Sequence, residues 1–296
     1  MKKEEIKYWI WFSRLKEIGC VKKKKLLEKY KTPIEISKLN EENLKECGIL
    51  DEKNIKYIFN QEYKQNLEKY EEYMEKNKID IITIFDEMYP ERLRQIYDSP
   101  IVLFAKGNLE LLKDGGIAIV GARNCSNYGK NTAQEIAYNI AQNNKCIISG
   151  LAKGIDKYAH TGALNAKGKT IAVIGNGLDD IYPGENKILA NNIIEKGGLI
   201  ISEYVIGTKP EKMNFPERNR IISALSDGIV VVEAREKSGA LITADFGLEH
   251  GKEIFAIPGN INSFNSVGTN ELIKQGANIV TDYKDVLDVC YNNYNY

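Results

Sequence analysis

The segment Asn214–Arg220 holds an aromatic ring, two guanidinium groups and two amides within seven residues. Lys209 and Lys212 precede it and the apolar pair Ile221-Ile222 follows it, so we expect its polar groups where a loop becomes a helix. Arginine and lysine bind phosphate, a ring can stack on a base, and a helix start offers free backbone N–H donors. The segment therefore predicts a site for an anionic chain with exposed bases. An irregular loop with a helix cap and a solvated charge pair is an equally weighted alternative.

Bulk composition argues against several other classes of site. The chain has 296 residues, 43% of them hydrophobic, and no apolar run approaches the roughly 20 residues that a membrane-spanning helix needs. Five cysteines without a C-x-x-C spacing, and two distant histidines, argue against a disulfide framework, a zinc site or a Ser/His/Asp triad. The N-terminus has no secretory apolar region. We therefore expect a cytoplasmic protein with reduced thiols, no membrane association, no metal and no cofactor.

Charge is balanced over the whole chain but uneven along it. The 41 basic and 41 acidic residues give a net charge of +0, so a nucleic-acid partner would have to meet a local patch. Residues 1–31 hold eleven Lys and Arg against four Glu. Within this stretch the run Lys22–Lys25 is expected to be a solvated helix face.

Residues 1–78 are predicted to form a small all-α domain. Apolar side chains recur at helical spacing from Trp9 to Ile18 and stop at Gly19, and a basic helix follows. Further helices are predicted at about residues 41–47 and over residues 61–78, the last of which could join two domains. A helix, a glycine turn and a basic helix resemble a helix-hairpin-helix or SAM-like module. A helical bundle that serves only as packing or spacer is the alternative.

Residues 79–296 are predicted to form an α/β domain with a doubly wound, mostly parallel sheet. Short β-rich runs alternate with amphipathic helices, and runs such as Ile171–Ile174 are apolar throughout, which is typical of strands covered on both faces. In such sheets ligands bind beyond the carboxyl ends of the strands. The predicted strands are residues 79–84, 117–120, 146–149, 170–174, 199–202, 228–233, 253–257 and 278–280.

Glycines and cationic or hydroxyl side chains follow several of these strands. Three loops carry them: Gly121, Arg123 and Ser126; Gly150, Lys153 and Gly154; and Ser238 and Gly239. A glycine turn lets backbone N–H groups approach a phosphate, and arginine adds a bidentate donor. Arg123 and Ser126 stand where a dinucleotide fingerprint needs glycines, so a nicotinamide cofactor is not expected. Pairing of Arg123 with a carboxylate, and Ser238 as a simple helix cap, are the structural alternatives.

The ordered set of motifs resembles the DprA/Smf family of DNA-processing proteins. The resemblance runs from about Tyr89 to Asp282 and includes the G-A-R-x-x-S loop, the segment Ser149–Asp156, G-x-G-L-D-x-x-Y-P, and N-F-P-x-R-N-R-I-I. Each motif alone is modest, but their order is specific.

This resemblance implies a fold, a function and partners. It implies an extended Rossmann-like domain that forms a homodimer, with a SAM-like N-terminal domain. The implied function is to bind single-stranded DNA, protect it and load the RecA recombinase onto it in natural transformation, without catalysis. Arg123, Lys153, Lys209, Lys212 and Arg218 would line a basic groove, with Phe215 contacting a base. Many members end in a winged-helix domain, which is not expected before Tyr296.

Fifteen residues are thus predicted to bind DNA. They are Gly121, Arg123, Ser126, Gly150, Lys153, Gly154, Lys209, Lys212, Asn214, Phe215, Arg218, Asn219, Arg220, Ser238 and Gly239.

Two other functions stay open at this point. The first is a Rossmann-like enzyme that acts on small nucleotides, for which Glu203, Glu217 and Glu233 are the candidate acids. The second is a scaffold that works through its N-terminal helices.

Overall fold

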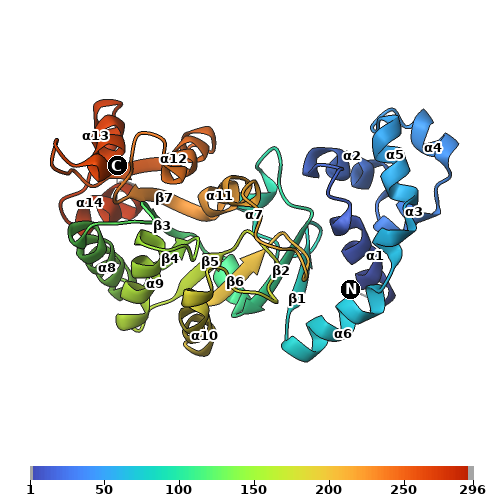
Figure 1. The fold of residues 1–296 in the computed structure, drawn as a ribbon, viewed down its shortest axis with the longest axis horizontal. Helices are drawn as coiled ribbons and strands as arrows, with labels where there is room; N and C mark the ends of the chain where they lie inside the picture. The colour runs from blue at the N-terminus through green and yellow to red at the C-terminus, as the bar shows by residue number, and fades with distance from the viewer. Residues whose placement is uncertain (1–2, 293–296) are drawn as a thin grey trace.

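The computed structural model describes residues 3–292. Its N-terminal part consists of short helices, drawn in blue and cyan at the right of Figure 1. Their bounds are α1 Lys3–Arg14, α2 Cys20–Tyr30, α3 Pro33–Lys38, α4 Glu41–Glu46, α5 Glu52–Phe59, the 3-10 turn η1 Gln61–Lys64 and α6 Leu67–Asn77. The sequence prediction missed α3 and α5, because helices of six and eight residues are too short to show a clear helical period.

Side-chain caps and apolar packing hold these short helices in place. Asp51 accepts a hydrogen bond from the backbone N–H of Asn54 at 2.8 Å, and Asn40 forms a reciprocal capping box with Asn43. Helices of this length are not stable alone in water. Their buried apolar side chains join one core around Trp11, which supplies the missing stability.

One lysine of the basic run is part of this interior. Lys23 is 5% exposed, and its ammonium group donates a hydrogen bond to the carbonyl of Ser13 at 3.2 Å. Burial lowers the pKa of Lys23 to about 8. The expectation that Lys22–Lys25 is a solvated face is therefore wrong at this position.

One mixed sheet organises the rest of the described chain. Its strand order is β1-β2-β6-β5-β4-β3-β7-β8-β9; every neighbouring pair from β6 to β9 is parallel, whereas β2 pairs antiparallel with both β1 and β6. The strands are β1 Asp80–Thr83, β2 Val102–Gly107, β3 Gly116–Val120, β4 Cys146–Ser149, β5 Thr170–Val173, β6 Leu199–Ser202, β7 Ser226–Val231, β8 Glu253–Ala256 and β9 Asn278–Ile279. The predicted α/β class with a mostly parallel sheet is confirmed. The prediction missed β2, an antiparallel strand outside the β-α alternation.

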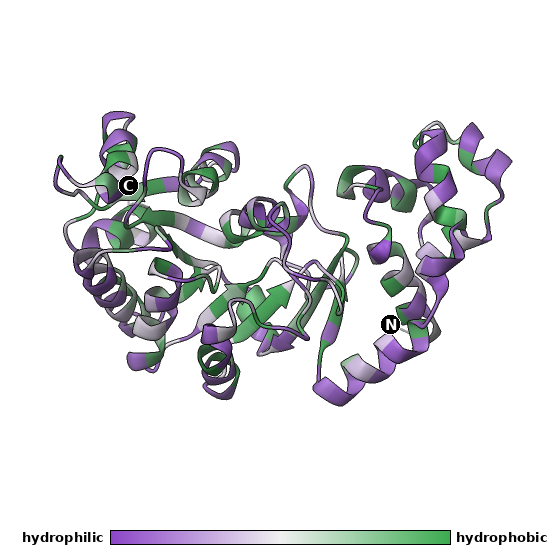
Figure 2. Cartoon of the chain, viewed as in Figure 1, coloured by the Kyte–Doolittle hydropathy of each residue, from purple (hydrophilic) through white to green (hydrophobic). Residues whose placement is uncertain are grey.

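Helices cover both faces of this sheet. They are α7 Glu91–Arg94, α8 Asn127–Gln142, α9 Ile155–Asn165, α10 Lys187–Glu195, α11 Asn214–Leu225, α12 Gly239–Glu249, α13 Val267–Lys274 and α14 Tyr283–Leu287, with short turns at η2 Leu109–Leu112, η3 Gly184–Asn186, η4 Phe264–Ser266 and η5 Asp288–Asn292. Successive side chains of a strand point to opposite faces. Accordingly Ile117 and Ile119 join the core under α8 and α9, whereas Ala118 and Val120 join the core on the other face. Figure 2 shows hydrophobic strands between more hydrophilic outer helices.

The order of the strands places the ligand-binding edge. Successive strands run outward from β3 through β4, β5 and β6 on one side, and β7, β8 and β9 continue on the other. The switch between these directions lies at β3 and β7, where sheets of this type bind ligands. We call the edge formed by the carboxyl ends of β3 to β8 the carboxyl edge.

The N-terminal helices contact the sheet domain beyond β1 and β2 (Figure 1). The ring centroids of Trp9 and Phe85 are 6.1 Å apart, and Lys16 forms an ion pair with Glu211 at 3.6 Å. Helix α6 ends at Asn77 and β1 begins at Asp80. The division into domains at residues 78 and 79 stays a prediction. Within residues 3–292 the structure holds no helix that is long and apolar enough to span a membrane.

Candidate nucleic-acid interface

The carboxyl edge carries a cavity of about 600 Å³. It lies where the loops after β3 and β4 meet the first turns of α11 and α12. Eight of the predicted site residues line it, namely Gly121, Arg123, Lys212, Phe215, Arg218, Asn219, Ser238 and Gly239. A smaller adjoining cavity of about 100 Å³ adds Gly150 and Lys153. We refer to the two together as the binding cavity.

A cation and two rings form the open part of the binding cavity. The guanidinium of Arg123 lies over the ring of Phe215, 5.2 Å from its centroid. The ring of Tyr182 is 5.7 Å from that of Phe215, and Tyr182 is 45% exposed. Within the described residues no carboxylate lies within ion-pair distance of Arg123. The alternative considered from the sequence, that Arg123 pairs with a carboxylate, is therefore not what the structure shows. An exposed guanidinium held against aromatic rings is suited to a phosphate next to a base.

Tyr182 was not predicted as a site residue. Its segment was noted from the sequence as the motif G-x-G-L-D-x-x-Y-P, without a role for the tyrosine. The ring comes from the loop after β5, and its partner Phe215 comes from α11. The signal available in the sequence was a tyrosine directly beyond a predicted strand end.

A close backbone approach brings the loops of Arg123 and Lys153 together. Gly154 has a φ of +73°, and a Cβ atom there would lie 2.2 Å from the carbonyl oxygen of Ala122. The N–H of Ile155 donates to the same carbonyl at 3.2 Å. Only glycine fits this contact, because it lacks the side chain that would collide. Gly154 therefore positions the loops rather than offering a group to a ligand.

Arg218 is a buried cation behind the rings. It is 4% exposed, and its Nη1 donates to the carbonyl oxygen of Gly150 at 2.7 Å and to that of Val173. Burial lowers the pKa of Arg218 to about 10, although nearby Asp156 opposes this shift and Arg123 adds to it. Its positive charge lies in the cavity wall, where the nearby Asp156 carboxylate partly offsets it.

Gly150 leaves the space that Arg218 occupies. A Cβ atom at Gly150 would lie 2.6 Å from Nη2 of Arg218 and 2.6 Å from Oδ2 of Asp156. That carboxylate accepts hydrogen bonds from the backbone N–H of Gly150 at 3.0 Å and of Ala152 at 3.4 Å. Burial raises the pKa of Asp156, against the lowering influence of Arg218 and these hydrogen bonds. Asp156 therefore holds the turn after β4 in shape.

Lys153 reaches the smaller cavity but has a partner of its own. Its ammonium lies 2.7 Å from the carboxylate of Glu185, and both side chains are about half exposed. This hydrogen bond raises the pKa of Lys153 and lowers that of Glu185. Solvent screens an exposed pair of this kind, so the pair contributes little to stability. A phosphate can therefore displace Glu185 from Lys153.

The start of α12 closes the other side of the binding cavity. Ser238 caps the helix by accepting a hydrogen bond from the N–H of Ala240 at 3.3 Å. The carbonyl of Gly239 accepts a hydrogen bond from the amide of Asn219 at 3.1 Å. This bond links α11 to α12. The side-chain oxygen of Asn219 also accepts a hydrogen bond from Nε of Arg218 at 3.2 Å. Ser238 serves as the simple cap considered from the sequence, and it also lines the cavity.

Helix α11 begins earlier than the sequence pattern indicated. It starts at Asn214, because Pro216 lies within the first turn, where a helix tolerates proline. The whole cationic segment is therefore helical, and its side chains are divided between two faces. Phe215 and Arg218 face the binding cavity, whereas Asn214 and Arg220 line a different cavity beside the N-terminal helices.

Arg220 therefore does not lie in the predicted site. Its guanidinium pairs with the carboxylate of Glu203 at 2.7 Å and with that of Asp98 at 2.9 Å, and one nitrogen lies 3.6 Å from the sulfur of Cys20. Burial alone lowers the pKa of Arg220, but these neighbours raise it above the ordinary value. Arg220 joins the sheet domain to the N-terminal helices.

Gly154, described above, and three further predicted residues also line neither part of the binding cavity. Asn214 is 7% exposed and lies on the side of the N-terminal helices. Lys209 is exposed in the loop before α11 and lines neither part of the cavity. Ser126 caps α8 by accepting from the N–H of Gly129 at 3.1 Å, and it bonds to Glu233 through its own N–H and hydroxyl.

None of the glutamates considered for catalysis lines the binding cavity. Glu203 pairs with Arg220, and Glu217 accepts a hydrogen bond from the hydroxyl of Tyr204 at 3.0 Å. Glu233 is buried and accepts hydrogen bonds from Ser126 and Asn265. The carboxylate of Asp156 does line the cavity, but it accepts hydrogen bonds from the backbone N–H groups of Gly150 and Ala152. Among the residues that the structure describes, no cluster of His, Cys, Asp or Glu is suited to a metal ion.

Fold and site together define an α/β protein whose switch point carries cations and rings suited to a chain of phosphates and bases. The model of one family, DNA recombination-mediator protein A, matches residues 80–290. The chain belongs to this family of DprA/Smf proteins.

Several relatives show the extent of the likeness. The DNA processing protein DprA of Streptococcus pneumoniae is 48% identical over 210 residues, 71% of this chain and 74% of that protein. Protein Smf of Synechocystis sp. is 36% identical over 292 residues, 97% of this chain and 73% of that protein.

Two solved structures are similar to this one. The X-ray structure of the S. pneumoniae protein superposes with a TM-score of 0.81 at 38% identity, covering 95% of this chain and 96% of that one. The structure of DNA processing protein A from Helicobacter pylori has a TM-score of 0.65 at 32% identity, covering 73% and 97%. That protein is described for its unique single-stranded DNA binding mode.

Proposed function

We propose that this chain binds single-stranded DNA at the carboxyl edge, protects it, and loads RecA onto it in natural transformation. The observation that carries the proposal is that Arg123 lies over the ring of Phe215 in a cavity that the buried Arg218 also lines. Arg123 and Lys212 would hold phosphates, and Phe215 with Tyr182 would stack on bases. Lys153 would join them after leaving Glu185, and the exposed Lys209 would attract the strand on its way in.

Single strands fit this site better than duplexes. The two rings lie beside the cationic groups inside a cavity, so a base must leave its stack to reach them. A flexible single strand can turn its bases inward, whereas a duplex hides them. The phosphate contacts do not distinguish sequences, so binding should be general and should weaken with salt.

The recombination role rests on the family and on the relatives. The family model describes a recombination mediator, and the H. pylori relative is described for its single-stranded DNA binding mode. Loading of RecA is the step that would turn DNA binding into mediation. We propose that this chain performs no catalysis and needs no cofactor. In support, none of the three glutamates considered as acids lines the binding cavity, and the Asp156 carboxylate there is bonded to backbone N–H groups.

We also propose a homodimer through the α/β domain. The face formed by α12 and α13 carries exposed apolar side chains, Ile242 at 36%, Leu248 at 63% and Val267 at 43%. Ile242 and Val267 line a cavity of about 710 Å³ between the two helices, and Leu248 lies farther along α12. An apolar surface of this kind is typical of a subunit interface. Residues 1–78 would form a separate SAM-like domain, and free cysteines in the described chain support a cytoplasmic location.

The proposed function is tested by titrating single- and double-stranded DNA of equal length at two salt concentrations. We expect tighter binding of the single strand, with affinity lost as salt rises. RecA filament formation on the bound strand is then measured with and without this protein. Equal affinity for both DNA forms would contradict the role of the rings, and unchanged filament formation would contradict the loading step.

A further inference from the structure

A second group of exposed apolar side chains lies on the loop after β8. Ile261 and Phe264 are 87% and 82% exposed, and Tyr128, in the first turn of α8, is 52% exposed. Tyr128 lines a cavity of about 480 Å³ together with residues 258–260 of this loop. We call this group, with the loop 257–266, the outer loop.

The outer loop is firmly held although its apolar side chains point outward. The hydroxyl of Tyr128 donates to the carbonyl of Pro258 at 3.0 Å. The N–H and the carbonyl of Gly259 bond to the amide side chain of Asn270 at 3.1 and 3.0 Å. The N–H of Ala234 donates to the carbonyl of Asn265 at 2.8 Å. A fixed loop presents its rings to a ligand with little further loss of conformational entropy.

Asn265 ties the outer loop to the loop of Arg123. Its side-chain amide donates a hydrogen bond to the backbone carbonyl of Asn124 at 3.0 Å. Asn124 directly follows Arg123, and Asn265 directly follows Phe264. The sheet order β3-β7-β8 places the two loops on either side of β7. Strands lie about 4.8 Å apart, so the ends of β3 and β8 are roughly 10 Å apart. That distance corresponds to about three nucleotides at the roughly 3.4 Å spacing of stacked bases.

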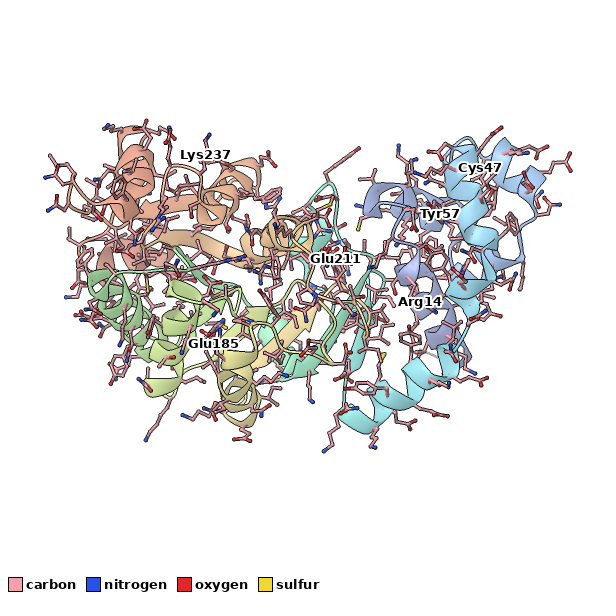
Figure 3. The ribbon with its side chains drawn as sticks, in the orientation of Figure 1. Arg14, Cys47, Tyr57, Glu185, Glu211 and Lys237 are labelled. Carbon is pink, nitrogen blue, oxygen red and sulfur yellow. The ribbon has the colours of Figure 1, made fainter. Side chains whose placement is uncertain are left out.

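The loop between these two positions carries two cations, Arg235 and Lys237, with Glu236 between them. Arg235 follows β7 and is exposed, and its Nε donates to Asn265 at 3.1 Å. Within the described chain the two terminal nitrogens of Arg235 have no hydrogen-bond partner and no carboxylate within ion-pair distance. Lys237 lies nearby on the same loop and is labelled in Figure 3. A phosphate crossing β7 therefore meets a guanidinium already oriented by the outer loop.

The cavity of about 480 Å³ that Tyr128 lines suits a base rather than a phosphate. The carboxylate of Glu233 lies at its wall and accepts hydrogen bonds from both the N–H and the hydroxyl of Ser126. This buried carboxylate occupies the positive start of α8, so an anion there would be repelled. An uncharged base between Tyr128 and the outer loop avoids that repulsion.

We propose that the outer loop is a second base-stacking position, with Phe264 as its ring and Arg235 as the phosphate contact that joins it to the binding cavity. The strand would run from Tyr182 and Phe215, past Arg123, across the end of β7 to Phe264. The inference rests on the proposed single-stranded DNA binding. Its ligand is the continuation of the same strand, because the cationic Arg235 is bonded to Asn265, and Asn265 is bonded in turn to the Arg123 loop.

The test compares the affinities of a short and a long oligothymidylate, of about 4 and about 16 nucleotides, the range of site sizes found for single-strand binding folds. Phe264→Ala should lower the affinity for the long oligonucleotide by roughly 5- to 150-fold and leave that for the short one unchanged. Tyr73→Ala, which removes an exposed ring from α6, is the matched control and should change neither. Phe264→Trp adds an exposed indole, whose fluorescence should be quenched by the long oligonucleotide only.

Each outcome has a distinct meaning. If the wild type binds neither length, the proposed function itself fails. If Phe215→Ala weakens binding but Phe264→Ala binds both lengths as the wild type does, only the outer position is overturned. A change in oligomeric state for Phe264→Ala, with DNA affinities intact, would assign the outer loop to a protein contact instead and would also overturn the proposal. Unquenched fluorescence of the added indole in the long complex of the Phe264→Trp variant would have the same consequence.

Discussion

Replacing Arg123 with alanine removes the exposed guanidinium over the Phe215 ring without breaking an ion pair among the described residues. The change leaves no buried group unpaired, because Arg123 is exposed. We therefore expect a folded protein whose thermal transition matches that of the wild type. Any loss of DNA affinity then reports on the contact itself.

The expected magnitude follows from counterion release. Each phosphate neutralised on a single strand contributes about 0.7 to the slope of log K against log salt. Arg123→Ala should flatten that slope by about 0.7, so the wild type loses roughly 2.6-fold more affinity than the variant between about 50 and about 200 mM salt. Phe215→Ala removes a stacking face of about 1–3 kcal/mol and should leave the slope nearly unchanged.

The contact between the two side chains makes their effects non-additive. A cation over an exposed ring contributes about 0.5–1 kcal/mol. The double variant Arg123→Ala/Phe215→Ala should therefore differ from the sum of the single variants by about this amount. The sequence alone contained no reason to expect this coupling.

Fluorescence anisotropy with a labelled oligothymidylate measures all three variants at several salt concentrations. Lys169→Ala is the control, because it removes one exposed positive charge next to the amino end of β5, at the opposite edge of the sheet. The control should retain the wild-type affinity and slope. If a folded Arg123→Ala protein has the wild-type slope, or if Lys169→Ala flattens it equally, the assignment of the carboxyl edge is refuted.

Three other changes test contacts around the site. Glu185→Gln releases Lys153 from its carboxylate partner, so single-strand affinity should rise a few-fold at low salt in the same titration; a fall would show that the pair itself is needed. Arg220→Met leaves the mostly buried Glu203 carboxylate without its main partner and should lower the free energy of unfolding in urea by roughly 3–5 kcal/mol, part of which Glu203→Gln should restore. Burial lowers the pKa of His160 to about 3, so the folded state keeps it neutral and stability should fall as pH drops below about 6.5, by up to about 1.4 kcal/mol per unit. A His160→Leu variant with an equally steep profile would assign that acid sensitivity to other groups.

The sequence predicted the parts of the fold that depend on local patterns. β5 is buried along its whole length, so its apolar run was visible without any structure. Glycine after a strand marked the turns at Gly121 and Gly150, and the α/β alternation fixed which strand ends share an edge. For this reason Arg123 could be assigned to the ligand edge before its neighbours were known.

The division of α11 was not predicted, because residues 214–220 were expected to span the change from a loop to a helix. Successive residues of a helix turn by about 100°, so Phe215, Arg218 and Ile222 share one face. Asn214 and Arg220 lie on another face. An earlier start, which Pro216 permits, would have allowed this separation to be read from the sequence.

Contacts between distant segments had no sequence signal. The approach of Tyr182 to Phe215 joins the loop after β5 to α11, and the ion pair of Lys153 with Glu185 joins two loops. The burial of Lys23 also depends on tertiary packing, which can cover a lysine whose sequence neighbours suggest a solvated face.

Helix α11 has few exposed side chains. Most of its side chains are buried, one side serves the binding cavity, and another is fastened to the N-terminal helices through Arg220. Fluorophores or affinity tags attached to α11 would therefore disturb the quantity they are meant to report. Labels for following this protein on DNA belong on the outward side of α8 or α10, where a dye can be carried without shifting the rings.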